Sequence, residues 1–406
     1  MIKHHIKKFF QLEASTGIIL IVATFFAMMI ANSKDSDFYF LFLSLEVPIK
    51  IDFIAYSKEL SLRDWVNDGL MAVFFFLIGL ELKKEVLEGD LSSKAKISLP
   101  AIAAIGGIIL PALIFYLFNH NKPSYLKGFA VPTATDIAFA YGMLCLFGKR
   151  ITTSAKIFLV ALAVLDDLAA ILIIALFYTK EINVAFLLLS SFSFIGLILL
   201  NRYGCRKVWP YLLCGLFLWL AILKSGVHAT IAGVLMAMFI PLRVGNTPIL
   251  EYIDRRLSPS VNFLILPVFA FVNAGVRIED FDISILYKDS IILGIILGLF
   301  IGKQFGVILL SYLAVRFKFA SLPRGTSWGE FYGVAIFTGI GFTMSLFIGS
   351  LAFSDSPLVF DKVKIAVLFG SILSLTYGSI IILTDSALQK YRKRVIKYDD
   401  QELKKY

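Results

Sequence analysis

The sequence predicts an all-α polytopic membrane protein with about twelve transmembrane helices. Of its 406 residues, 58% are hydrophobic and 17% are charged, whereas soluble domains have about 45–50% apolar and about 25% charged residues. Crossing a bilayer as a helix takes roughly 20 mostly apolar residues. Twelve such runs occur, with centres near residues 23, 74, 108, 137, 168, 191, 215, 234, 267, 302, 341 and 374.

The placement of the 39 Lys and Arg residues predicts the orientation of these spans. Of these residues, 26 lie on the side of the membrane that includes both termini, 12 lie on the other side, and Lys303 lies within a span. The positive-inside rule therefore places both termini in the cytoplasm. The net charge of +10 follows from this topology and requires no acidic partner. We expect no nucleic-acid partner, and no nucleotide, because no Walker-type loop occurs.

The chain has no polar linker long enough to separate soluble domains. We therefore predict a single transmembrane domain over residues 1–385 and a basic cytoplasmic tail over residues 386–406. The basic start MIKHHIKKFF is not followed by a small-residue cleavage site, so the first apolar run is expected to remain as a span. Cys145, Cys205 and Cys214 lack metal-ligand spacing and are expected to be packing residues.

A β-hairpin is predicted outside the membrane, within residues 45–60. Apolar and charged side chains alternate in residues 49–53 (IKIDF), and a period of two is typical of a strand. An exposed hairpin has unpaired edges that can add to a second copy of the chain. We therefore expect a homodimer with a contact there. Asn67 and Asp68 are expected to cap the N-terminus of the second span.

Two spans are predicted to be broken helices. The fourth contains GFAVPTATDIAFAYG, in which Pro132 lacks an N–H, and the eleventh contains FTGIGFTMS, in which Gly339 and Gly341 flank one residue. At membrane depth, a break in a helix is tolerated only where protein groups or water form hydrogen bonds with the freed backbone N–H and C=O groups. Interruptions at corresponding positions of two halves are typical of transporters built from inverted repeats. The breaks correspond if spans three to five repeat as spans ten to twelve.

Besides Asp136 in the fourth span, charged side chains lie inside the predicted spans at Asp166 and Asp167 on the fifth and at Lys303 on the tenth. Each costs about 2.5–3.5 kcal/mol on insertion scales, and such residues mark ion or proton pathways. Adjacent helix positions point about 100° apart, so the two aspartates are expected to differ in role. One can pair with Lys303 while the other faces a cavity. An ion pair alone does not explain the second aspartate, and its oxygens suit Na⁺ or Li⁺.

Burial offers a physical route from these carboxylates to ion exchange. Loss of water disfavours a charged carboxylate and so favours its protonation, whereas a nearby cation favours the charged form. Proton and metal cation therefore compete for the same oxygens. Asp136, just after the fourth-span break, is suited to neutralising an exposed helix N-terminus and Lys303 a C-terminus, with direct ligation of the ion as the alternative role for Asp136. Thr135 can either ligate the cation or bond its own helix backbone.

Six sequence blocks together resemble the NhaA-type Na⁺/H⁺ antiporters of bacterial inner membranes: VPTATDIAFA, ALAVLDDLAAI, LKSGVHATIAGV, FVNAGV, GLFIGKQFG and GIGFTMS. The resemblance implies that the two broken helices cross near the membrane midplane. It also implies electrogenic export of Na⁺ or Li⁺ against protons, with Asp167 as the main cation ligand and Asp166 paired with Lys303. Thr135 and Asp136 would lie at the break. Either Asp166 or Lys303 would release the transported proton.

The same resemblance implies regulation by pH. It points to Glu81 and Glu85 after the second span, to Asp254 before the ninth, and to His228. Histidine is the side chain that titrates near neutrality. Each residue also has a purely structural interpretation. The three acids can be solvated residues at helix ends, and His228 can be a packing or hydrogen-bonding residue.

Other function classes explain the sequence less well. An intramembrane aspartyl protease needs two aspartates on separate helices facing one water, typically with a GxGD element, whereas Asp166 and Asp167 are adjacent and no GxGD occurs. A solute:Na⁺ symporter of similar architecture is disfavoured by Lys303, and a passive channel does not need carboxylates that bind protons. We therefore expect a transporter and not an enzyme, with no cofactor besides the transported Na⁺ or Li⁺ and H⁺.

Overall fold

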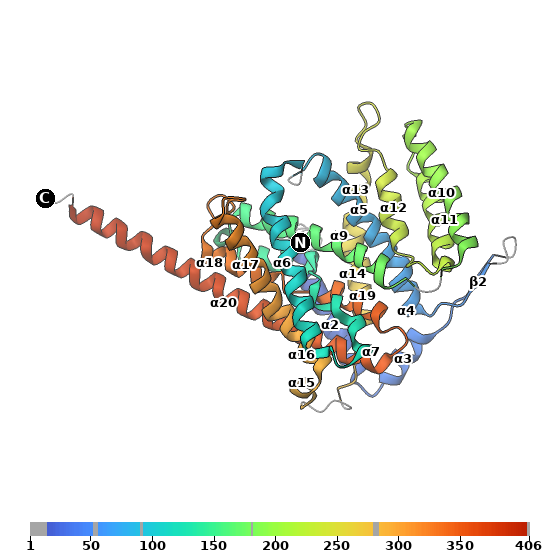
Figure 1. Ribbon diagram of the computed structural model, residues 1–406, viewed down its shortest axis with the longest axis horizontal. Coiled ribbons are helices and arrows are strands. Elements are labelled where there is room, and N and C mark those ends of the chain that lie inside the picture. The colour runs from blue at the N-terminus through green and yellow to red at the C-terminus, as the bar shows by residue number, and fades with distance from the viewer. Residues whose placement is uncertain (1–13, 52–55, 90–91, 180–181, 279–283, 404–406) are drawn as a thin grey trace, which may run out of the picture.

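The computed structural model describes residues 14–51, 56–89, 92–179, 182–278 and 284–403. It is a bundle of helices of very different lengths, from which the end of the last helix projects (Figure 1). All twelve apolar centres predicted from the sequence lie in helical segments or, near residue 341, at a break between two helices. The fold is therefore the predicted all-α membrane fold.

The first half of the chain begins with α2 (Ser15–Ala31) and α3 (Ser36–Ser44), which are bent by 111° at their junction. The sequence did not predict α3. Antiparallel strands β1 (Ile49–Ile51) and β2 (Tyr56–Lys58) follow, with Ile49 opposite Lys58 and Ile51 opposite Tyr56. The remaining elements are α4 (Leu62–Asp64), η2 (Trp65–Leu70), α5 (Met71–Leu87), α6 (Lys94–Asn119), α7 (Pro123–Leu126), η4 (Lys127–Thr133), α8 (Ile137–Cys145), η5 (Gly148–Arg150) and α9 (Thr153–Phe177).

The second half contains α10 (Val184–Arg202), α11 (Trp209–Ser225), α12 (Ile231–Phe239), α13 (Ile249–Ser260), η6 (Val261–Ile265), α14 (Leu266–Ala274), α15 (Ile285–Lys288), α16 (Ser290–Leu297), η7 (Gly298–Gly302), α17 (Lys303–Arg316), α18 (Trp328–Phe337), α19 (Phe342–Ala352) and α20 (Pro357–Leu403). Seven helices or runs of consecutive helices in the described ranges are long and apolar enough to cross a bilayer. α12 is not, because its nine residues extend only about 14 Å at 1.5 Å per residue.

One prediction about a helix end is wrong. Asn67 and Asp68 do not cap the second span, because that helical run begins earlier, at Leu62. Ser61 is the N-cap there and forms a capping box with Asp64. Asn67 and Asp68 lie inside the π-helical turn η2, where the Asn67 side chain accepts a hydrogen bond from Asn273.

Both predicted breaks are present. In the fourth span, η4 ends at Thr133 and α8 begins at Ile137. In the eleventh, α18 ends at Phe337 and α19 begins at Phe342. The breaks lie against each other, because the Asp136 N–H donates to the Ile340 carbonyl at 2.8 Å. The two broken helices therefore cross and satisfy part of each other's backbone.

The helices form two groups by their closest packing. The first, here called the repeat bundle, holds the broken spans with α6, α9, the continuous run α16–η7–α17, and α20. In the second group α5 packs mainly on α12, α10 on α11, and α14 on α2. The division matters because inverted-repeat transporters move one bundle against the other.

A crossing of α6 and α17 holds the repeat bundle together. A Cβ atom on Gly306 would lie 2.1 Å from the Gly106 carbonyl oxygen, and one on Gly106 would lie 2.1 Å from the Gly306 oxygen. Small residues allow such close approach of helices in a membrane, where packing rather than water exclusion drives association. Lys303 begins α17 one turn before this crossing, so the crossing fixes its position.

We predict that Gly306→Ala destabilises the protein, because the added methyl group has no room beside the Gly106 carbonyl. Overpacking typically costs about 1–3 kcal/mol, so the apparent melting temperature in detergent should fall by several degrees. Gly17→Ala on α2 is the matched control, because its Cβ would meet only ordinary contacts at 3.5 Å from Met143. Equal melting temperatures for the two variants would contradict the packing argument.

Candidate ion-binding site

The two adjacent aspartates lie near the middle of α9. This helix begins where the Thr152 hydroxyl accepts the Ala155 N–H at 3.2 Å, and it runs uninterrupted through Phe177. Asp166 and Asp167 are 2% and 1% exposed. Burial at this depth means that protein groups or a bound ion must offset both charges, because water cannot.

Asp166 is held by two partners from different spans. Its Oδ2 atom accepts hydrogen bonds from the Lys303 ammonium and, at 2.7 Å, from the Thr135 hydroxyl. Lys303 is completely buried and directly follows the π-helical turn η7, a local irregularity that is frequent at functional sites. The Thr135 oxygen also lies 2.8 Å from the Thr338 carbonyl, so one hydroxyl links both breaks to α9.

Asp167 has a different environment. Neither of its carboxylate oxygens has a hydrogen-bond partner among the described residues, and Asp166 Oδ1 has none either. The charged groups that act on Asp167 are Asp166, Asp136 and Glu81, which repel its negative charge, and Lys303, which attracts it. The single lysine cannot neutralise three buried carboxylates. The cluster therefore favours an additional positive charge, either a proton or a metal cation.

Asp136 caps two half-helices at once. Its Oδ1 atom accepts the Phe139 N–H at 2.9 Å at the start of α8. Its Oδ2 atom accepts the Thr343 N–H at 3.0 Å at the start of α19, together with the Thr343 hydroxyl. A carboxylate is favourable at each positive helix end. The sequence indicated a single cap here, and it missed Thr343 and Thr338, whose only signal was their place beside the glycines of the eleventh span.

A cavity of about 320 Å³ leads toward the crossing. It lies between the two groups of helices, with Ser15, Glu81 and Asn262 on one wall and Asp136 and Met344 on the other. Its lining includes Asp136 but not Asp167. The cavity therefore reaches the break in the fourth span and stops short of the Asp167 carboxylate.

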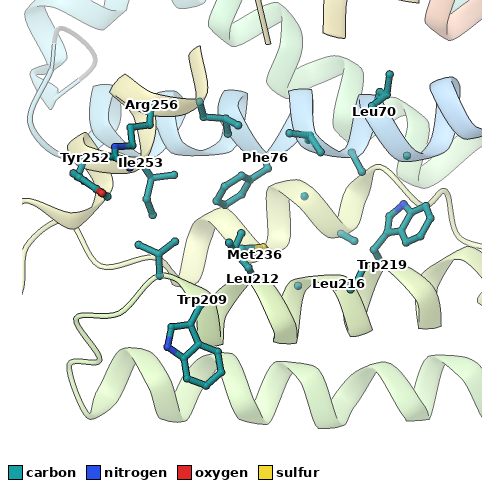
Figure 2. A pocket seen from close by; sticks show the side chains of 18 of the residues that line it. Leu70, Phe76, Trp209, Leu212, Leu216, Trp219, Met236, Tyr252, Ile253 and Arg256 are labelled. Atoms are coloured by element: carbon teal, nitrogen blue, oxygen red, sulfur yellow. The ribbon is translucent and has the colours of Figure 1, made fainter. Parts of the chain in front are cut away.

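An apolar cavity of about 750 Å³ lies elsewhere in the molecule. Figure 2 shows its wall of apolar side chains, including Phe76, Met236 and Trp219, with Arg256 at one end. It belongs to the second group of helices, and its lining residues, all from the described ranges, include no carboxylate. An ion site needs oxygen ligands, so size alone does not identify the functional cavity here.

The four residues that the resemblance linked to pH lie in two places. Asp254 forms an ion pair with Lys84 at 3.3 Å and repels Glu81 electrostatically, as does Glu85. These three acids thus form one cluster at the C-terminal end of α5. His228 lies near the other end of α5, where its Nδ1 atom is 3.8 Å from Asp68 Oδ1.

Comparisons with known proteins show the family to which the chain belongs. A family model described as Na⁺/H⁺ antiporter 1 matches residues 7–382. The chain belongs to this family. The Na⁺/H⁺ antiporter NhaA of Pelagibacter ubique is 47% identical over 93% of this chain and 96% of its own length. The corresponding protein of Campylobacter concisus is 49% identical over 95% of both chains, and that of Shewanella frigidimarina is 48% identical over 92% of this chain and 94% of its own.

Membership of the Na⁺/H⁺ antiporter 1 family decides two of the predictions. Members of this family are transporters, so the prediction that the chain is not an enzyme is confirmed. The apolar helices and the family together confirm a multi-pass membrane protein.

We predict that Asp136→Ala destabilises this antiporter-family protein more than Thr343→Val does. The alanine variant leaves the buried Phe139 and Thr343 N–H groups without their acceptor, and each such loss costs about 1–3 kcal/mol. The valine variant removes only the hydroxyl donor and keeps both caps. Thermal unfolding in detergent without Na⁺ compares the two, and a larger loss for Thr343→Val would show that the double cap is not the main tie between the breaks.

Proposed function

We propose that the protein is a secondary active antiporter that exports Na⁺, and also Li⁺, in exchange for protons. The observation that carries the proposal is that both oxygens of buried Asp167 lack a hydrogen-bond partner within the described part of the chain, beside an Asp166 already bound by Lys303 and Thr135. Carboxylate and hydroxyl oxygens are suitable ligands for a hard cation. In this proposal Asp167 is the main ligand, and Asp166 and Thr135 contribute further oxygens.

Competition for these oxygens makes the exchange obligatory. Asp167 holds either a proton or a cation, and the charged, empty carboxylate is disfavoured at this depth. If the site can change the side of the membrane to which it opens only when Asp167 holds a proton or a cation, then Na⁺ moves in one direction only when protons move in the other. We propose that more protons enter than Na⁺ ions leave in each cycle. A membrane potential of 100 mV then drives each net charge inward with roughly 2.3 kcal/mol. The proposed exchange is therefore electrogenic, and Asp166 or Lys303 carries the additional proton.

We further propose a bacterial inner-membrane location with both termini in the cytoplasm. The distribution of Lys and Arg supports this orientation. The cavity beside Asp136 then opens to the cytoplasm, because it is lined by residues at the N-terminus of α2 and near the C-terminus of α5. A cytoplasmic Na⁺ ion would enter by this route.

The acid cluster at the end of α5 is proposed as the site of pH regulation. Glu81 lines the cytoplasmic cavity, and Asp254 and Glu85 repel its negative charge. Protonation of Glu81 would lower the field that attracts Na⁺ into the cavity, and its deprotonation would raise that field. Activity should then increase at alkaline pH. His228, whose Nδ1 atom is 3.8 Å from Asp68 Oδ1, is proposed as a second regulatory residue at the other end of the same helix.

The first test uses vesicles with an imposed pH gradient, to which Na⁺, Li⁺ or K⁺ is added. We expect Na⁺ and Li⁺, but not K⁺, to collapse the gradient with the wild type. Asp167→Asn should abolish the collapse, because an amide provides neither the charge nor the proton site. An absence of cation-dependent proton flux in the wild type from about pH 6 to 9, a range that spans histidine titration, would contradict the proposal.

A second test concerns pH. Asp254→Asn removes a negative charge near Glu81 and frees the positive charge of Lys84, so Glu81 should ionise more readily. We expect the flux to switch on at lower pH than in the wild type. Glu251→Gln is the matched control, because Glu251 pairs with exposed Arg255 on the same helix, at 2.6 Å. Identical pH profiles for Asp254→Asn and the wild type would exclude Asp254 from regulation.

A third test concerns assembly. We propose a homodimer in which the β1–β2 hairpin adds to its copy, since both strands have a free edge in the two-stranded sheet. Deleting residues 45–58 should convert the dimer to a monomer in detergent, as measured by light scattering. A dimer that persists after the deletion would remove the hairpin from the interface.

A further inference from the structure

Besides Lys303, a second lysine, Lys364, is almost completely buried. It is 1% exposed and lies two turns into α20, and the ion site described above does not use it. A buried ammonium is costly unless it is paired, so its partners show what it holds in place.

Lys364 binds a helix end from the other group of helices. Its ammonium donates to the Gly275 carbonyl at 3.2 Å and to Asp361 Oδ1 at 2.8 Å. Gly275 is the C-cap of α14, where unpaired carbonyls and the negative end of the helix dipole favour a cation. Because α20 belongs to the repeat bundle and α14 does not, this contact ties the two groups together.

The tie lies on the side of the membrane opposite the cavity. Asn262, which lines the cavity, and Gly275 lie thirteen residues apart on the run η6–α14. Along a helix this separation is roughly 20 Å. The cavity separates the two groups of helices near one end of this run, and Lys364 joins them at the other end.

An aromatic layer closes the same side. The ring of Phe347, on α19, contacts three rings of the second group. The distances between ring centroids are 5.3 Å to Phe75, 6.2 Å to Phe269 and 5.5 Å to His228. Phe347 belongs to the repeat bundle, whereas the other three belong to the second group. Movement of the bundle that opens this side must therefore separate both the aromatic contacts and the Lys364 tie.

We propose that Lys364 is a positioning residue that keeps the external side closed while the cytoplasmic cavity is open, and that it releases the Gly275 carbonyl when the site turns outward. The inference rests on the proposed alternating-access function. Asp361 supports the release, because it is 40% exposed and stays with Lys364 on α20. The ammonium therefore keeps an ionic partner when it leaves α14.

A neighbouring lysine provides a matched control. Lys362 pairs with Asp289 at 2.6 Å, and Asp289 is the N-cap of α16. Both residues belong to the repeat bundle, so breaking this pair does not affect the contact between the groups. Lys362→Met and Lys364→Met remove the same charge from the same helix, two residues apart.

The experiment measures thiol accessibility in detergent with a water-soluble thiol reagent. In a background with Cys145, Cys205 and Cys214 replaced by serine, one reporter is Val276→Cys beside the tie, and the other is Asn262→Cys in the cavity. With Lys364→Met, we expect labelling to become up to about tenfold faster at Val276→Cys, the equivalent of about 1.4 kcal/mol. Labelling at Asn262→Cys should become slower, and Lys362→Met should change neither rate.

Opposite changes at the two reporters distinguish a shift between conformations from loosened structure. Faster labelling at both sites would indicate local unfolding and overturn the proposal, as would unchanged rates. The measurement requires no transport, so its outcome is independent of the vesicle test. Opposite changes at the two reporters, together with no Na⁺-dependent proton flux in the vesicle test, would support the role of Lys364 and refute the proposed antiport.

Discussion

The crossing of the two broken helices is the constraint on which the rest of the site depends. Backbone groups freed at membrane depth must find partners inside the protein. Here the breaks supply them to each other: the Ile340 carbonyl accepts the Asp136 N–H, and the Asp136 carboxylate caps both α8 and α19. A single side chain thus fixes the relative position of two half-helices that lie about 200 residues apart in the chain.

This arrangement determines which carboxylates remain for ion binding. Asp136 accepts hydrogen bonds from two helix ends, and Asp166 accepts hydrogen bonds from Lys303 and Thr135. Asp167 is left with two oxygens that lack partners among the described residues. The negative charge is therefore concentrated where one cation or proton can offset it. In the proposed mechanism this site binds either a proton or a cation, and the two ions exchange there.

Local sequence was sufficient for some features and not for others. The lengths of the apolar runs predicted the spans, and Pro132 and Gly339 indicated the breaks. Both features depend only on residues within one helix. The sequence could not show that Asp136 caps α19 as well as α8, or that Lys364 binds the end of α14, because these contacts join distant segments. The expected cap at Asp68 was wrong for a local reason. Ser61 and Asp64 begin the helix earlier, and the apolar run alone did not mark that start.

Competition between Na⁺ and protons at Asp167 is the central claim, and proton release tests it most directly. Purified protein in weakly buffered detergent solution is titrated with Na⁺ near neutral pH while the released protons are recorded with a pH indicator. The account predicts that Na⁺ binding releases protons, with K⁺ inactive, and that Asp167→Asn releases none. Saturable Na⁺ binding without proton release in the wild type would contradict it, because the two ions would then occupy separate sites.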